Sequence, residues 1–395
     1  MANVRNFATV YSSEYQMVFI EQAVAMEVAD VSLKSVGKGN SFKKSYPEVS
    51  DSDVYSRSSD MVPTDVNDTE EYLTVDKEYY ISRYIDKHDN LQDLKDTAAK
   101  YAEIDAQSMA RDIDADILGE AFNAGNTIDD GDFSGTAGNS VAITASNVTT
   151  LFGLANEKMD LQNVPRGNRV AVVSPRLRRI LTDYGIGKDT QMGDEFFTRG
   201  GVGMVDGFRV LFSNLLPTSY VLGLATNPTA NDTVTIAGQV FTFVSSIGTT
   251  AGNVLIGGDA DATRLNLATL INAPATTTAN GVALTGAKLK TFRKRISAVN
   301  DATANTLTVK YKGGGASTVA SSLTATTDVW NANKSTSHCV FMHDKAISAV
   351  VQEAPDLDVN KAPLRKGNFQ NTTSLYGVKT FNDGTKMLVN AKIKL

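Results

Sequence analysis

The sequence predicts an α+β protein that carries a small α+β insertion. A helical pattern of apolar residues covers residues 89–123, and helix and strand patterns alternate between residues 140 and 223. Residues 224–336 have a different composition, with 14 charged side chains among 113 residues, against 68 among the other 282. That stretch contains 22 Thr and has a net charge of +4, while the remainder sums to −10. Such a change is expected of a self-contained module inserted into a loop of a host domain.

Length and composition limit the class of protein. A chain of 395 residues is too long for one compact core, and 42% apolar with 21% charged residues is ordinary for a globular protein. We expect no membrane partner and no signal peptide, because no apolar run approaches about 18–20 residues and Met1–Asn6 lacks the required pattern. The net charge of −6 argues against a dedicated nucleic-acid binder, but it permits a protein that surrounds nucleic acid.

The first 84 residues divide into two segments. Apolar residues at spacings of three and four predict a helix over residues 13–33. Residues 38–84 are polar and extended, with β-favouring pieces at Ser41–Tyr46, Val54–Arg57 and Tyr79–Ile85. Such a segment is either a mobile surface loop or a long two-stranded arm that is ordered by a neighbouring subunit.

The next elements follow from periodicity. Residues 89–123 keep a helical period for nearly nine turns and contain no Pro or Gly before Gly119, so they predict a helix about 50 Å long. After a polar loop to Ser140, we expect helices and strands in alternation. These are helix Ser146–Leu161, strand Arg169–Ser174, helix Pro175–Tyr184 and, after the Gly200–Gly203 turn, a strand at 207–213.

The insertion predicts a hairpin, a helix and a second hairpin. Residues 233–244 alternate around an Ala-Gly turn, Asp261–Ile271 is amphipathic, and Arg295–Val299 faces Leu307–Lys312 across a polar turn.

The last 59 residues predict mainly strands. We expect strands at Val340–Met342 and Ser348–Gln352 with a short helix near Lys345 between them, and paired strands at 375–381 and 386–394 joined by Asn382-Asp-Gly384.

No residue pattern points to catalysis, so we expect no catalytic, cofactor-binding or metal-binding residues and no enzyme activity. The three histidines, His88, His338 and His343, lack metal-ligand spacing, and no Gly-x-Ser-x-Gly elbow is present. Asp112 and Asp116 share a helix face while Asp114 points elsewhere, which favours a solvated or interface face over a metal site.

Four other features also favour structural readings. Asp129-Asp-Gly-Asp132 lacks the spacing of a calcium loop, Gly200–Gly207 lacks the Gly-Lys-Ser/Thr of a phosphate loop, and Cys339 has the apolar neighbours of a core residue. The densest basic cluster could meet nucleic acid or an acidic neighbour, or be a solvated loop. It consists of Lys288, Lys290, Arg293, Lys294 and Arg295.

The order of these parts resembles the major capsid proteins of tailed bacteriophages, with the Hong Kong 97-type fold. Phe208-Arg-Val-Leu-Phe-Ser-Asn-Leu-Leu-Pro217 is similar to that family's strand ending in Ser-Asn-x-Leu-Pro. Val340-Phe-Met-His-Asp-Lys-Ala-Ile347 is similar to its Phe-His-Lys-x-Ala-Ile segment, with Met342 as a departure.

The resemblance implies the following division of the chain. It consists of an N-terminal arm (1–37), an extended loop (38–84), a spine helix with part of the peripheral domain (85–139), an axial domain (140–223), an inserted accessory domain (224–336) and a return through the peripheral domain (337–395).

The resemblance also implies function. It implies a structural subunit that self-assembles, as hexamers and pentamers, into the icosahedral shell of a virion built in the host bacterial cytoplasm. The shell would enclose double-stranded DNA without sequence-specific binding. Scaffolding, portal and decoration proteins are possible partners, and no cofactor is implied. Two alternatives stay open: an encapsulin-like compartment shell, and a phage or cell-surface binding protein that uses the 224–336 module.

Overall fold

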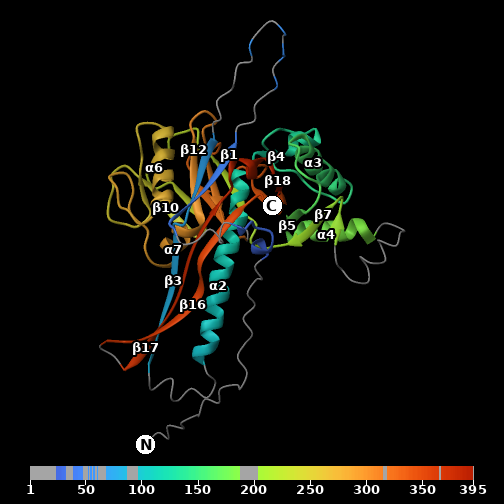
Figure 1. Ribbon diagram of the computed structural model, residues 1–395. Helices are drawn as coiled ribbons and strands as arrows, with labels where there is room; N and C mark the ends of the chain where they lie inside the picture. Colours follow the sequence, from blue (N-terminus) through green and yellow to red (C-terminus); the bar gives the residue numbers. More distant parts are fainter. Residues whose placement is uncertain are drawn as a thin grey trace, which may run out of the picture.

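The computed structural model describes residues 24–32, 39–47, 52, 54, 55, 57, 60, 68–86, 97–186, 203–314, 318–363 and 366–394. A long helix lies beside a long three-stranded sheet in the middle of the molecule (Figure 1). The α6 and α7 helices lie on one side of this pair, and the α3 and α4 helices lie on the other. The helical elements are η1 (Ala25–Glu27), α2 (Thr97–Gly119), η3 (Glu120–Asn123), η4 (Asp130–Phe133), α3 (Val148–Leu161), α4 (Pro175–Ile186), α6 (Ala260–Asn272), α7 (Gly286–Arg295) and α8 (Asn382–Lys386).

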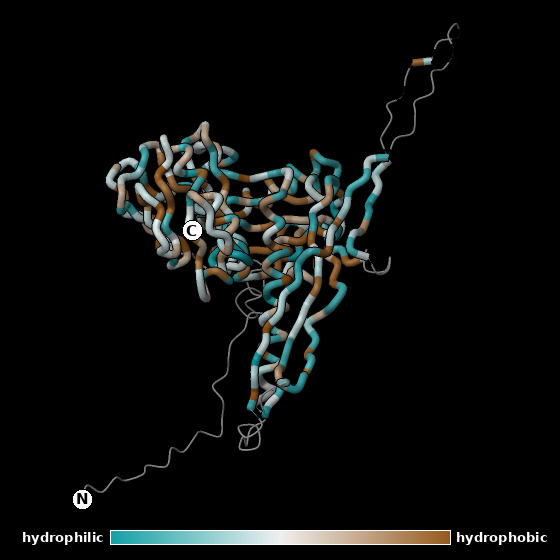
Figure 2. Tube along the Cα trace, turned by 90° about the vertical axis from the view of Figure 1, so that its left-hand side faces the viewer, coloured by the Kyte–Doolittle hydropathy of each residue, from teal (hydrophilic) through white to brown (hydrophobic). Residues whose placement is uncertain are grey.

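The long sheet and α2 form a narrow extension (Figure 2). The sheet has the antiparallel order β16-β17-β3, and α2 packs on one of its faces. Its strands are β16 (Ser348–Lys361), β17 (Gly367–Lys379) and β3 (Lys77–Asp86). The predicted long helix is confirmed from Thr97 to Gly119, with a 3₁₀ turn to Asn123, while residues 89–96 lie outside the described part.

A nine-stranded sheet forms the centre of the body. Seven strands follow the order β12-β13-β8-β15-β5-β7-β6, and β18 pairs with β15 and β4. The strands are β4 (Asn126–Ile128), β5 (Arg169–Val173), β6 (Met204–Val205), β7 (Phe208–Phe212), β8 (Thr218–Gly223), β12 (Ile296–Asp301), β13 (Thr306–Tyr311), β15 (Thr336–His343) and β18 (Leu388–Lys394). The rings of Phe152, Phe208 and Phe341 meet edge to face at 5.2–6.0 Å, which joins α3 to this sheet. The elements α3, β5, α4 and β7 confirm the predicted helices and strands between residues 146 and 213.

The segment 224–336 has a hydrophobic core of its own. Its small sheet has the order β11-β10-β9-β14, with strands β9 (Thr233–Ile236), β10 (Gln239–Val244), β11 (Asn253–Leu255) and β14 (Val319–Ser322). The predicted first hairpin and helix are confirmed, and Ala237 and Gly238 turn the hairpin with φ of 51° and 70°.

The two ends of this segment lie together, because the Asp328 carboxylate accepts hydrogen bonds from the Ala225 and Thr226 amides, both at 3.0 Å. The predicted second hairpin, β12–β13, is also present. It continues the central sheet, since β13 pairs with β8 over six residues. The segment 224–336 is thus joined to the central sheet by the backbone pairing of β13 with β8, as well as by its two chain ends.

Two predicted helices and one predicted strand are not found in the described residues. The described end of the predicted 13–33 helix holds only the 3₁₀ turn η1 and a bridge from Asp30 to Ser348, because the carboxylate of Asp114 fixes this backbone in a non-helical path; residues 13–23 lie outside the described part. Residues 344–347 form turns rather than a helix near Lys345. Of the predicted Val54–Arg57 strand, the described residues 54, 55 and 57 are not in a strand.

The predicted C-terminal hairpin was also wrong. β17 pairs with β16 and β3 in the long sheet, whereas β18 pairs with β15 and β4 in the central sheet. The connecting residues form the short helix α8, and Gly384 does not have the positive φ of a tight hairpin turn. The Asn-Asp-Gly sequence therefore joins two sheets instead of two neighbouring strands.

Candidate assembly surfaces

A two-stranded ribbon forms a sheet of its own beside the long sheet. The strands β1 (Ser41–Pro47) and β2 (Asp68–Thr74) pair in antiparallel register, and within the described residues neither has another strand partner. Beyond them, Val54 is 91% exposed and Tyr55 is 65% exposed. An isolated two-stranded ribbon is marginally stable in water and has two open edges, so it is suited to pairing with another chain.

The base of the ribbon is held firmly. A cluster of buried apolar side chains joins it to the long sheet and consists of Phe42, Leu73, Val75, Val350 and Phe381. The ammonium of Lys379 donates to the carbonyl of Tyr72 at 2.8 Å. At Gly377 a Cβ atom would come within 2.6 Å of the carbonyl oxygen of Thr74, so the ribbon crosses β17 at a point where only glycine leaves room.

One face of α2 carries two aspartates that bind basic residues from distant parts of the chain. The carboxylate of Asp112 accepts hydrogen bonds from Lys294, at 2.7 Å, and from Arg295 at the end of α7. Asp116 pairs with Lys77 at 3.1 Å and accepts a hydrogen bond from the buried hydroxyl of Tyr376 at 2.7 Å. The predicted shared face of Asp112 and Asp116 is confirmed, and it is an interface within the subunit.

These contacts shift the pKa values of the groups involved. Burial alone would lower the pKa of Arg295, but the carboxylate of Asp112 raises it above the ordinary value. Burial and the charge of Asp116 raise the pKa of Tyr376 far above the usual range. At neutral pH Arg295 therefore stays positively charged and Tyr376 stays protonated. The ion pair that joins α2 to α7 and the hydrogen bond that joins α2 to the long sheet are both kept.

Asp114 faces the other way, as the helical spacing predicts. One of its oxygens accepts hydrogen bonds from the backbone amides of Val24, at 2.8 Å, and Ala25. The same stretch is held at a second point, where Arg209 and Glu27 form an ion pair at 2.6 Å. Asp114 thus fixes residues 24 and 25 against α2.

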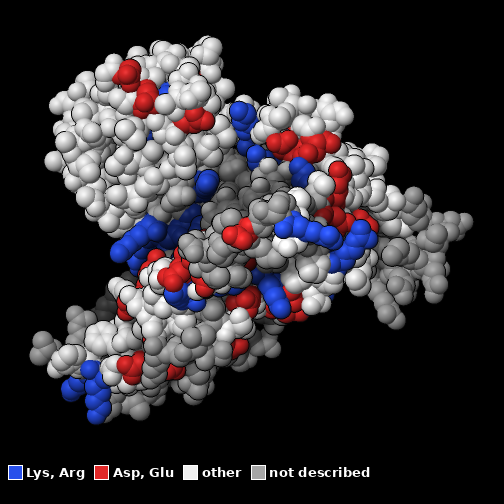
Figure 3. All heavy atoms as spheres, turned by 45° about the horizontal axis from the view of Figure 1, so that its top comes forward, with Lys and Arg blue, Asp and Glu red and all other residues white. Residues whose placement is uncertain are grey.

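The basic cluster lies on α7, which is a helix and not the loop considered as one alternative. Lys294 and Arg295 point to α2, and the ammonium of Lys288 donates to the carbonyl of Ala237. Lys290 and Arg293 are exposed. Figure 3 shows Lys and Arg side chains gathered where this part of the molecule meets the long sheet, while the surface of the 224–336 segment in view carries few charges.

The other sequence candidates have structural roles. His338 is buried between Asn390 and Ser219, at 3.0 and 2.8 Å, and burial lowers its pKa to about 4. Burial raises the pKa of Cys339 to about 12, as suits a core thiol. His343 is buried beside Asp344, and His88 lies outside the described residues.

The Asp129–Asp132 loop satisfies its own backbone. Asp129 accepts from the Gly131 and Gly138 amides at 2.9 and 2.8 Å, and Asp132 binds Lys158 at 2.9 Å. Within the ranges that the structure describes, no group of three or more His, Cys, Asp or Glu side chains could hold a metal ion. In the same ranges no helix is long and apolar enough to cross a membrane.

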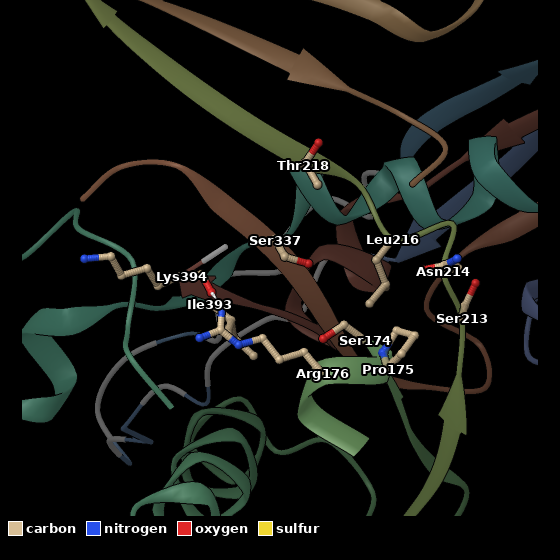
Figure 4. A pocket seen from close by; sticks show the side chains of 10 residues that line it. All are labelled: Ser174, Pro175, Arg176, Ser213, Asn214, Leu216, Thr218, Ser337, Ile393 and Lys394. Carbon is tan, nitrogen blue, oxygen red and sulfur yellow. Dashed lines mark hydrogen bonds between the residues drawn. The ribbon is translucent and has the colours of Figure 1, made fainter. Parts of the chain in front are cut away.

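A cavity of about 230 Å³ lies where β5 and β7 end and α4 begins (Figure 4). The hydroxyls of Ser174 and Ser213 accept hydrogen bonds from the amides of Leu177 and Leu215 at 3.3 and 3.0 Å. The hydroxyl of Thr218 points away from the other labelled side chains. Arg176 also lines the cavity, and its guanidinium donates to the carbonyl of Lys394 at 3.1 Å.

Comparison with known proteins agrees with this architecture. Residues 89–247 match the model of a family described as phage capsid protein. A solved structure from Mycobacterium phage Che8 is similar with a TM-score of 0.59 and 15% identity, covering 98% of each chain. The capsid of cyanophage P-SCSP1u has a TM-score of 0.58 and 13% identity, covering 98% of this chain and 93% of that one. The mature capsid of bacteriophage PhiM1 has a TM-score of 0.52 and 14% identity, covering 98% and 92%. None of the curated protein sequences compared with the chain is similar to it.

The fold is that of phage capsid subunits of the Hong Kong 97 type. The sequence match over residues 89–247 includes α2, the helices and strands from α3 to β8, and the hairpin β9–β10. The sequence match over part of the chain and the fold are thus both those of phage capsid proteins.

Proposed function

We propose that the ribbon β1–β2 reaches over a neighbouring subunit and that this contact builds the icosahedral shell. The observation that carries the proposal is the ribbon itself: its base is fixed by a buried cluster, yet its two edges have no strand partner in the described chain. Pairing with a neighbour would satisfy backbone groups that the subunit leaves open.

In this proposal the chain divides as its sequence suggests. Residues 1–37 are the arm, 38–84 the extended loop, 85–139 the spine with part of the peripheral domain, 140–223 the axial domain, 224–336 an accessory domain and 337–395 the return. The subunit has a structural role without catalysis, and it encloses double-stranded DNA without reading its sequence. Assembly takes place in the host cytoplasm, and scaffolding, portal and decoration proteins are the further partners.

A deletion between β1 and β2, which removes the connection of the extended loop beyond the paired strands, tests how far the loop must reach. Residues 48–67 are replaced by Asn-Gly, which keeps the β1–β2 pairing possible through a two-residue turn. The unaltered chain should form closed uniform shells in negative-stain electron microscopy, and the shortened chain should stay as folded subunits or small oligomers. Normal shells from the shortened chain would show that residues 48–67 are not needed for the contact and would count against the proposed reach of the extended loop.

A further inference from the structure

The exposed face of the long sheet carries acidic side chains on β3 and β16. Residues that pair across strands share a face, and Glu78, Leu375 and Glu353 lie in one such row. Asp356 and Asp358 follow on β16, each paired with an uncharged residue of β17. Lys379 of β17 has the same alternation, but it lies at the base of the sheet and donates to the carbonyl of Tyr72. None of the four carboxylates forms an ion pair with a described residue. We refer to Glu78, Glu353, Asp356 and Asp358 as the acidic face.

A second exposed surface carries the opposite charge. Lys290 and Arg293 are three residues apart on α7, so they project from one side of the helix. Both side chains are exposed, and neither forms an ion pair with a described residue. The two remaining cations at the end of α7 are already bound to Asp112.

The spacings of the two surfaces agree. Residues i and i+3 of a helix have Cβ atoms about 5–6 Å apart. Residues i and i+2 of a strand are about 7 Å apart on the same face. Lys290 and Arg293 could therefore meet Asp356 and Asp358 pairwise, each cation with one carboxylate.

The two surfaces cannot meet within one subunit. Lys294 of α7 lies 4.3 Å from the centre of the Tyr79 ring, and Tyr79 packs against Tyr376, whose hydroxyl binds Asp116 of α2. Hence α7 lies on the α2 side of the long sheet. Tyr80, which follows Tyr79 in β3, points to the opposite face of the sheet together with Asp356, and its side chain is 75% exposed.

We infer that Lys290 and Arg293 of one subunit bind the acidic face of a second copy of the chain, chiefly at Asp356 and Asp358. Because two different surfaces meet, the contact is head-to-tail and can repeat around a ring. The inference rests on the proposed assembly into a shell, and it adds a subunit contact through the 224–336 segment to the contact made by the ribbon.

Charge reversal tests the contact directly. The variants are Lys290→Glu with Arg293→Glu, Asp356→Lys with Asp358→Lys, and all four together, which keeps the net charge of −6. All four positions are exposed, so each variant should fold, and circular dichroism of unassembled subunits checks this. Particle yield is measured by sedimentation and electron microscopy.

We expect each double variant to lose about tenfold or more of the particle yield, because like charges then face one another, and the fourfold variant to recover it. A matched control, Arg179→Glu with Lys345→Glu, reverses two other exposed cations and should assemble normally. Normal assembly of either double variant, failure of the fourfold variant to recover, or an equal loss in the control would overturn the inference. Failure of the unaltered chain to form particles would instead count against the proposed shell assembly.

Discussion

The junction between α2 and α7 should depend on one carboxylate. Asp112 accepts hydrogen bonds from Lys294 and Arg295, and its side chain is only 12% exposed. Asp112→Asn keeps the shape but removes the charge, so it leaves two cations together without a counter-charge. A hydrogen bond to a charged group contributes about 1.5–3 kcal/mol to stability. The contribution of the Lys294 bond is smaller, because the Lys294 side chain is partly exposed. We expect the free energy of unfolding to fall by about 2–3 kcal/mol.

The assay is urea unfolding of unassembled subunits, followed by circular dichroism for the whole chain. The fluorescence of Trp330, the one tryptophan in the sequence, reports on the 224–336 segment. Glu103→Gln on the exposed side of α2 serves as the control and should change stability by less than about 0.5 kcal/mol. Adding Arg295→Met to Asp112→Asn should recover part of the loss, since it removes the uncompensated charge. A loss for Asp112→Asn no larger than that of Glu103→Gln would refute the reasoning.

Four further outcomes are expected. Because burial lowers the pKa of His338 to about 4, the unfolded chain binds the proton first as pH falls, so stability should drop by about 3 kcal/mol between about pH 6.5 and 4, and His338→Gln should flatten this pH profile of urea midpoints. Cys339 should react with a maleimide at pH 8 only after denaturation, and rapid labelling of the folded subunit would contradict its burial. Gly377→Ala should destabilise the ribbon base by about 1–3 kcal/mol, visible as faster proteolysis of residues 39–75, because the added methyl would press on the Thr74 carbonyl. Phe208→Ala should cost about 3–5 kcal/mol in urea unfolding, since its ring is fully buried among two others; a loss below about 1 kcal/mol would argue against that core.

Local patterns in the sequence were sufficient for elements whose partners are near in sequence. Alternation around Ala237 and Gly238 located the first hairpin, and uninterrupted helical spacing located α2. The same reasoning failed at Asn382-Asp-Gly384, because the strands on either side belong to different sheets. Sheet membership depends on residues hundreds of positions away, which local turn chemistry does not encode.

On the candidate assembly surfaces, too, contacts between residues far apart in sequence could not be predicted. The sequence suggested a two-stranded arm in residues 38–84 as one alternative, but β2 lies outside the three β-favouring pieces. Helix α7 has few apolar positions and was considered as a loop; it forms because Phe292 packs on Phe241 at 5.5 Å and because its last residues bind Asp112. An acidic neighbour for the basic cluster was foreseen, but its identity, 182 positions earlier, could not be read from spacing.

The most direct test is a cryo-electron microscopy reconstruction of particles purified from cells that express the chain. Assembly through the ribbon predicts that β1 and β2 of each subunit contact a neighbouring subunit in a closed icosahedral shell. A shell in which the ribbon contacts only its own subunit or solvent would contradict the account.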